Sequence, residues 1–374
     1  MLFKVVERDT DTHARLGILE LNGKRIKTPV LWLGCMLKYK PRPWEFFKVH
    51  TIMVNAYEII EQKIMINSIH KFLDTNGLVM MDSGGFQLMK KNVHVSPTKV
   101  LEIYKQTKPD IGVVLDYPLN PLDLNNRMKR WKKTLKNTRF MLENSHDIVL
   151  MPVVHGYTLK EIKRACAEIK DIIDPKVVGV GSLVPILKYM KTSTILKLNG
   201  MNTIKFMINA ISIIRKEFPD SFLHVFGVGS VSTMHLMFSL GVDSVDSMSW
   251  RMKAAYGAIQ LPGIGDRFIS PKNSRKKLME EHLLSKCECP ICVNKSLKER
   301  KKALDNSKYG TFYNRAIHNA YIFKKEEHAF HKALETKNVA AFLHERLKRT
   351  KYRKLVKFTE FRLKSLLECE EIRG

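Results

Sequence analysis

Two aspartates that follow short apolar runs have the type and placement needed for glycosidic chemistry. Asp82 comes directly after residues 79–81 and opens the run Asp-Ser-Gly-Gly-Phe-Gln, and Asp246 ends the run 242–246. The two glycines after Asp82 let a flat ligand approach the main chain closely, because they carry no side chain. In such a pair, one carboxylate attacks an anomeric carbon while the other manages the proton on the leaving group. A helix cap or a strand-end turn is the alternative for each aspartate.

A third acid and two aromatic rings could hold a nucleobase beside this pair. Asp116 ends another apolar run, and its carboxylate could accept hydrogen bonds from the N–H edge of a purine-like base. Phe86 and Phe226 could stack on the faces of the base, a contact that any base can make. For Asp116 alone, a structural cap is an equal alternative.

Clustered cysteines predict a metal site. The chain carries three thiols at C-x-C-x₂-C spacing and a histidine 26 residues further on, namely Cys287, Cys289, Cys292 and His318. A Cys₃His set is typical of tetrahedral structural zinc, in which four protein ligands leave no position open for water. His282 and His328 are alternative fourth ligands. Free thiols without a metal are another alternative, and an iron–sulfur cluster would lack its usual fourth cysteine.

An alternation of strand-like and helix-like segments runs through residues 28–250. The strand candidates are residues 28–35, 51–55, 77–81, 111–116, 147–154, 176–180, 222–227 and 242–246. The helix candidates between them are residues 96–107, 125–144, 159–172, 202–218 and 231–240. This pattern predicts an α/β protein, a (β/α)₈ TIM barrel, with a doubly wound sheet as the alternative.

The candidate site residues all lie at the same place relative to the predicted strands, at their carboxyl ends. Each falls at or just past the end of a strand candidate: Asp82, Asp116, His155, Gly181, Phe226 and Asp246. Active sites of TIM barrels lie at the carboxyl ends of the strands, so this phase predicts a site at that rim.

Composition points to a polyanionic partner. The 374 residues carry a formal net charge of +27, and 44% of them are hydrophobic. Nucleic acid is the leading candidate, because Lys and Arg contacts to phosphates supply most non-specific affinity. A membrane surface and a merely lysine-rich surface are alternatives, and the basic segment 128–144 could be a solvated helix or part of the polyanion contact. No apolar run reaches the ~20 residues that span a bilayer, so we expect a soluble cytoplasmic protein.

We expect three parts along the chain. Residues 1–270 form the TIM-barrel domain, residues 271–325 a small zinc-binding subdomain, and residues 326–374 basic helices that pack back on the barrel.

These motifs together resemble the tRNA-guanine transglycosylase superfamily over about residues 1–325. The carriers are Asn55-Ala56-Tyr57, the run 82–87, Asp116, Phe226-Gly227-Val228-Gly229, Asp246 and the cysteine cluster with His318. The resemblance implies exchange of guanine in a polynucleotide for a 7-deazaguanine, with Asp246 forming a covalent glycosyl intermediate and Asp82 acting as general acid/base. It also implies structural Zn²⁺. The base-binding residues would be Ser83, Phe86, Asp116, His155, Gly181 and Phe226.

Departures from the family pattern favour its DNA-modifying branch. His155-Gly156 replaces a Gln-Gly pair, Gly181-Ser182-Leu183 replaces Gly-Gly-Leu, and Ser249-Trp250-Arg251 follows where bacterial tRNA enzymes have Pro-Thr-Arg. We therefore expect DNA as the substrate and 7-cyano-7-deazaguanine as the incoming base. A tRNA enzyme, or a catalytically silent partner subunit of one, is the alternative.

The same branch suggests nucleic-acid contacts and partners. Trp250 and Arg251 could fill the gap left by an unstacked base or hold a phosphate, together with Lys253, although Trp250 could equally belong to the core. Further expected partners are helper ATPase- or nuclease-like proteins of a modification cluster and a second copy of the chain. The host would be bacterial, archaeal or a phage-infected cell.

Overall fold

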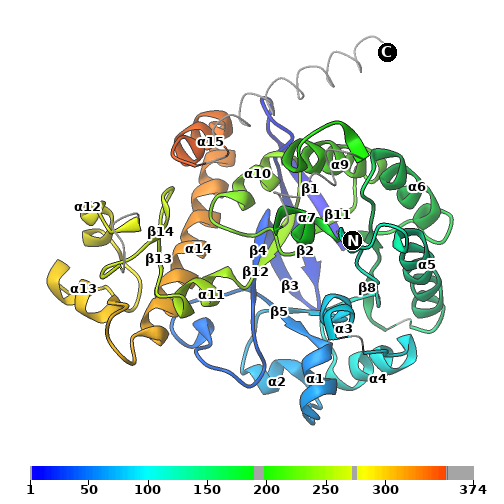
Figure 1. Cartoon of the computed structure of the whole chain (residues 1–374), viewed down its shortest axis with the longest axis horizontal. Coiled ribbons are helices and arrows are strands. Elements are labelled where there is room, and N and C mark those ends of the chain that lie inside the picture. The colour runs from blue at the N-terminus through cyan, green and yellow to red at the C-terminus, as the bar shows by residue number, and fades with distance from the viewer. Residues whose placement is uncertain are drawn as a thin grey trace.

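Parallel strands form a closed barrel inside a ring of helices in the computed structural model, which describes residues 2–91, 93–145, 147–188, 198–271, 276–350 and 352 (Figure 1). The barrel strands are β4 (Val30–Gly34), β5 (Thr51–Asn55), β6 (Leu78–Asp82), β7 (Ile111–Val113), β8 (Val149–Met151), β9 (Val153–Val154), β10 (Val177–Val180), β11 (Phe222–Val225) and β12 (Ser244–Ser247). The last strand, β12, pairs in parallel with the first, β4, and so closes the ring.

Two of these segments share one barrel position. β8 pairs with β7 and β9 pairs with β10, and the two are separated only by Pro152. Proline has no N–H to donate to a ladder, which explains the interruption. The ring thus has eight positions, all eight strand predictions are confirmed, and the doubly wound alternative is wrong.

Helices of the outer ring follow the strands. Five of them were predicted: α4 (Pro97–Thr107), α5 (Arg127–Glu143), α6 (Leu159–Lys170), α9 (Thr203–Glu217) and α10 (Thr233–Ser239). The short helices α1 (Ala56–Gln62) and α2 (Ile69–Leu73) were not predicted. Shorter helical segments are η1 (Pro43–Glu45), α3 (Gly85–Lys91) and α7 (Leu183–Lys188). α4 begins where the helix candidate 96–107 begins, because the Ser96 hydroxyl accepts the Lys99 N–H at 3.1 Å and Pro97 fits the first turn.

An antiparallel sheet that the sequence patterns did not predict covers the amino-terminal end of the barrel. It consists of β1 (Phe3–Arg8), β2 (Arg15–Leu21) and β3 (Lys24–Thr28). The ring of Phe3 packs edge-on against Phe222, at the start of β11, with centroids 5.5 Å apart. The buried Arg15 pairs with the buried Asp243 at 2.7 Å, just before β12. The opposite end of the barrel remains for the site.

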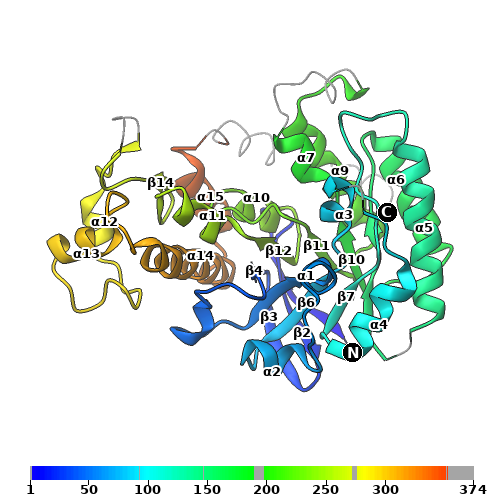
Figure 2. The same cartoon turned by 60° about the horizontal axis from the view of Figure 1, so that its bottom comes forward.

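A small lobe lies to one side of the barrel, and a long helix joins the two (Figures 1 and 2). Its elements are α11 (Ser249–Ala255), β13 (Ile259–Leu261), β14 (Gly265–Arg267), α12 (Glu281–Ser285) and α13 (Leu297–Leu304). Helix α14 (Phe312–Glu335) packs against α11, β13 and barrel strand β4, and α15 (Val339–Leu347) packs against α10.

The long helix bears on the expected division of the chain. The expected boundary at residue 325 falls inside α14, which runs from the lobe to the barrel without a break. Residues 353–374 of the expected basic tail lie outside the described residues. Across the described part of the chain, no helix has the length and apolar character needed to cross a membrane.

Candidate active site

The strand ends bring the predicted carboxylates together in one cavity. The cavity has a volume of about 410 Å³ at the carboxyl end of the barrel. Its lining includes Asp82, Phe86, Asp116, Gly181, Phe226 and Asp246. Residues from five different strand ends therefore meet here, although 164 positions separate Asp82 from Asp246 in the sequence.

Asp82 is held at the end of β6 by its neighbour on β5. The Asn55 side-chain oxygen caps α1 by accepting the Tyr57 N–H at 2.8 Å, and this fixes the amide so that its nitrogen donates to Asp82 Oδ2 at 2.9 Å. Burial, and then the negative charges of Asp116 and Asp246, raise the pKa of Asp82 from 3.8 to about 8. Asp82 therefore keeps its proton near neutral pH and has one to donate.

Asp246 is placed by the segment Phe226-Gly227-Val228-Gly229. The Gly227 N–H donates to Asp246 Oδ1 at 2.5 Å, and the Gly229 N–H donates to the main-chain carbonyl of Asp246 at 3.0 Å. A side chain at position 229 would lie 2.4 Å from that carbonyl oxygen, so only glycine permits this approach. Among the described residues, no hydrogen bond to Asp246 Oδ2 is found, and the Asp246 side chain lines the cavity.

His224 is a residue at this site that the sequence patterns did not single out. Its imidazole is fully buried on β11, with Nδ1 2.7 Å from the Ser244 hydroxyl and Nε2 3.4 Å from Asp246 Oδ1. The ring also packs edge-on against Phe226, with centroids 4.5 Å apart. Its position in an apolar strand gave no sign of this contact, which depends on the pairing of β11 with β12.

Asp116 lies in the cavity wall, and two predicted base-binding residues support it from behind. His155 Nδ1 lies 2.8 Å from the Ser182 hydroxyl, and its Nε2 lies 3.0 Å from Asp116 Oδ2, outside hydrogen-bond geometry. The Ser83 hydroxyl donates to Asp116 Oδ1 at 3.5 Å. Both His155 and Ser83 are buried and do not line the cavity. The structure therefore places them as supports of Asp116 rather than as residues that touch a base.

Two phenylalanines and one glycine occupy the positions predicted for holding a flat ring. Phe86 on α3 is 41% exposed, which leaves its face accessible, and Phe226 lies at the end of β11. Gly181 lies against His155, whose Cε1 would be 2.4 Å from an added Cβ, so a larger residue would push the imidazole and then Asp116. Met248 and Met252 also line the cavity and were missed, because apolar side chains in a short helical run do not differ from core residues by type.

The structure places Trp250 in the core, which was the alternative to a nucleic-acid contact for this residue. Its side chain is only 1% exposed, and Nε1 donates to the Gly34 carbonyl at 3.1 Å, so the indole belongs to the core between α11 and β4. The Arg251 guanidinium donates to the Lys40 carbonyl at 2.6 Å and lies over the Phe312 ring. The Lys253 side chain pairs with Asp266 at 2.5 Å but stays 41% exposed.

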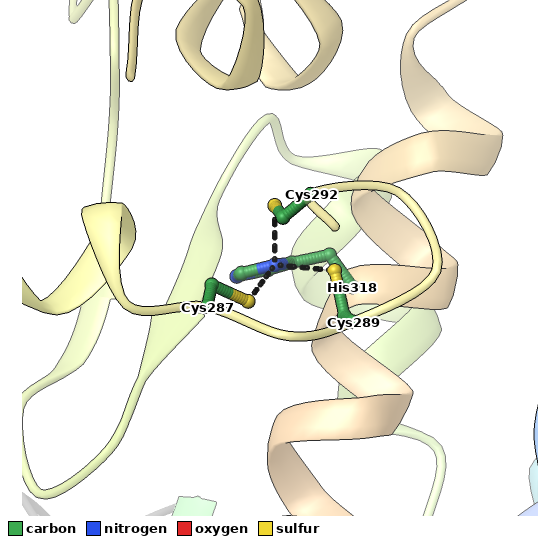
Figure 3. A group of neighbouring side chains, drawn as sticks. All are labelled: Cys287, Cys289, Cys292 and His318. Carbon is green, nitrogen blue, oxygen red and sulfur yellow. Dashed lines mark hydrogen bonds between the residues drawn. The ribbon is translucent and has the colours of Figure 1, made fainter. Parts of the chain in front are cut away.

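The four predicted metal ligands converge in the lobe. His318 Nδ1 lies 3.5 Å from Cys287 Sγ, 3.4 Å from Cys289 Sγ and 3.7 Å from Cys292 Sγ (Figure 3). Tetrahedral zinc, with Zn–S of about 2.3 Å and Zn–N of about 2.0–2.1 Å, would separate sulfur from nitrogen by about 3.6 Å. All four residues are buried, so the set could hold a metal ion away from water.

Two further observations support His318 as the fourth member of the cluster. His318 Nε2 lies 3.0 Å from the Gln260 carbonyl, a contact that orients the ring with Nδ1 toward the thiols. Neither His282 nor His328 belongs to the cluster within the described residues.

Comparison with known proteins gives the family of this chain. The sequence profile of the queuine tRNA-ribosyltransferase family matches residues 9–352, and the chain belongs to this family. The tRNA-guanine(15) transglycosylase of Pyrococcus abyssi is 27% identical over 335 residues, which are 87% of this chain and 53% of that protein. The tRNA-guanine(15) transglycosylase of Methanopyrus kandleri is 30% identical over 297 residues, 76% of this chain and 60% of that protein. The chain thus spans about half to three fifths of the length of these relatives.

Proposed function

We propose that this protein is a pentosyltransferase that exchanges guanine in a nucleic acid for another guanine-like base. The observation that carries the proposal is the arrangement of Asp82 and Asp246 in one cavity, where the raised pKa of Asp82 lets it keep a proton and Asp246 Oδ2 is not engaged in a hydrogen bond with a described residue. Family membership supports the same chemistry, because the family is described by ribosyl transfer. A silent partner subunit would have no need for either acid.

The exchange proceeds through two displacements at one sugar carbon. Asp246 Oδ2 attacks C1′ of the target guanosine, the bond from C1′ to N9 breaks, and the leaving guanine takes the proton from Asp82. The incoming base then gives its N9 proton to Asp82, and N9 attacks C1′ and displaces Asp246. Both carboxyl groups return to their starting states, and the configuration at C1′ is retained.

Recognition of guanine depends on Asp116 and the two rings. The Asp116 carboxylate accepts the N–H groups of the guanine edge, while His155 and Ser83 hold it in place. Phe86 and Phe226 border the same cavity and stack on the base. The incoming base that we propose is 7-cyano-7-deazaguanine, which presents the same N–H edge.

The substrate that we propose is tRNA, which reverses the order expected from the sequence. The relatives reported above are named for tRNA, and Trp250, one of the residues that favoured DNA, belongs to the core. The formal charge of +27 suits either polyanion. The expected helper proteins and the homodimer stay predictions.

The metal that we propose for the Cys₃His set is Zn²⁺. Sulfur and imidazole ligands at tetrahedral spacing suit zinc, and four protein ligands leave no position for water or substrate. Zinc would therefore hold the lobe onto α14 through His318, and no step of the exchange passes through it.

The test is incorporation of radiolabelled guanine by the purified zinc-loaded protein into unmodified tRNA transcripts and, in parallel, duplex DNA. Label should enter tRNA, and an Asp246→Asn variant should incorporate none. Label that enters DNA alone would overturn the choice of tRNA. Absence of label from both nucleic acids would overturn base exchange itself.

A further inference from the structure

A second cavity lies directly behind the wall of the catalytic one. It has a volume of about 240 Å³ and is formed by α3, residues 93–95, the segment after β7 and one face of α5. The two cavities share Asp116 in their linings. Gly85 packs directly against Asp116 in the wall between the two cavities, and a Cβ at position 85 would lie 2.3 Å from Asp116 Oδ1.

One helical face supplies three cations to this second cavity. Lys129 and Arg130 are adjacent on α5, each lies about one helical turn before Lys133, and all three line the cavity. None of the three has a carboxylate within ion-pair distance among the residues that the structure describes. By contrast, Arg127 on the same helix is neutralised by Glu161 at 2.6 Å.

Arg130 gives a second sign of a missing ligand. Its Nε is buried and has no hydrogen-bond partner within the described ranges, although Nη1 donates to the Pro118 carbonyl at 3.3 Å. A buried guanidinium N–H without an acceptor is costly, so Arg130 brings an unsatisfied donor to the side of the cavity that it lines.

Two carboxylates also line this cavity and offset part of the positive charge of the three cations. The two acids in the lining are Asp116, beside His155, and Asp123, whose carboxylate accepts from Asn126 Nδ2 at 3.0 Å. With three cations against these two carboxylates, the lining keeps a net positive formal charge that attracts an anion.

Apolar and aromatic walls complete the cavity. Leu88, Met89, Val93 and Leu115 line one part of it, and Tyr117 lies under Lys133, whose Nζ is 5.0 Å from the ring centroid. A free inorganic ion has no use for such walls, whereas a nucleobase packs on apolar and aromatic faces while its phosphate meets the cations.

We propose that this cavity binds a nucleotide that neighbours the exchanged one in the substrate chain, with its phosphate against Lys129, Arg130 and Lys133. The proposal rests on the proposed function, since it assigns a subsite to the same nucleic-acid substrate. Occupation of both cavities would hold the chain on either side of Asp116. The basic face of α5 is then a specific contact and not only a solvated surface.

The test compares two double variants that remove the same charge from the same helix. Lys129→Ala/Lys133→Ala removes cavity cations, and the control Lys132→Ala/Lys136→Ala removes two exposed cations that do not line the cavity. All four side chains are exposed, so neither variant disturbs the core. The dissociation constant for an unmodified tRNA transcript is measured over a range of salt concentrations, and guanine exchange is measured at saturating tRNA.

The cavity variant should raise the dissociation constant about tenfold and reduce the salt slope by about 0.7–0.9, the value for one lost phosphate contact. The control should change both much less, and it should also keep the wild-type exchange rate at saturation. Equal slopes and equal dissociation constants in the two variants would overturn the subsite while leaving base exchange intact. A wild-type protein that exchanges no guanine, but shows the difference between variants, would overturn the proposed function and leave the subsite standing.

Discussion

The raised pKa of Asp82 predicts how the stability of the protein depends on pH. Folding raises this pKa from 3.8 to about 8, so the folded state holds a proton that the unfolded chain releases above about pH 4. The free energy of unfolding therefore carries a penalty that is absent below pH 4, grows as the pH rises and is complete above pH 8. An Asp82→Asn variant, which cannot ionise, escapes this penalty.

The magnitude follows from the size of the pKa change. A rise of about 4 pKa units, at 1.36 kcal/mol per unit, corresponds to about 6 kcal/mol as an upper bound. The Asp82 side chain is partly exposed in the cavity, so water screens part of this energy. Relative to the wild type, the variant should gain about 2–4 kcal/mol of unfolding free energy between pH 5 and pH 9.

Urea unfolding at pH 5, 7 and 9, followed by circular dichroism, measures this difference. The matched control is Asp220→Asn, the same substitution at a carboxylate whose side chain is 90% exposed, and its difference from the wild type should stay nearly constant. A difference between Asp82→Asn and the wild type that is flat across pH, or that shrinks as the pH rises, would refute the reasoning.

Three other predictions concern the nucleophile, the lobe and the base of the barrel. Gly229→Ala should push the Asp246 backbone, because the new Cβ would lie 2.4 Å from its carbonyl oxygen, and kcat should fall about 100-fold while the fold is kept; kcat within twofold of wild type would contradict this. We expect one zinc ion per chain in the wild type. The His318→Ala variant should lose this zinc, measured by elemental analysis, and should have a lower Tm, measured by calorimetry. Full zinc content in the variant would show that His318 is not a ligand. Arg15→Met should cost about 3–5 kcal/mol by leaving the buried Asp243 short of a partner, with kcat unchanged in the folded fraction; a loss of kcat alone would contradict a purely structural role.

The barrel was predictable because its strands and helices carry strong local signals. Runs such as residues 77–81 are apolar on both faces, as expected of strands buried in a parallel barrel, and helix starts such as Ser96-Pro97 are encoded within a few residues. Because Asp82 and Asp246 each come at the carboxyl end of a predicted strand, both were expected at the same rim of the barrel. The cysteine cluster was equally clear, because thiol spacing alone defines a short metal loop.

The amino-terminal sheet and the supports of the site were not predictable in the same way. β1 is mostly exposed and mixes charged with apolar residues, so its sequence has no clean alternation. The roles of His155, His224 and Trp250 depend on contacts with residues distant in the chain, which residue type does not reveal. His155 thus supports Asp116 from behind it, and Trp250 is a core residue of the α11–β4 contact.

Trapping the covalent intermediate tests the central claim most directly. The zinc-loaded protein is incubated with an unmodified tRNA transcript without free base, denatured, digested and analysed by mass spectrometry. We expect a ribosyl ester on the peptide that contains Asp246, discharged by added guanine and absent from Asp246→Asn. An ester on Asp82, or guanine exchange that survives in Asp246→Asn, would contradict it.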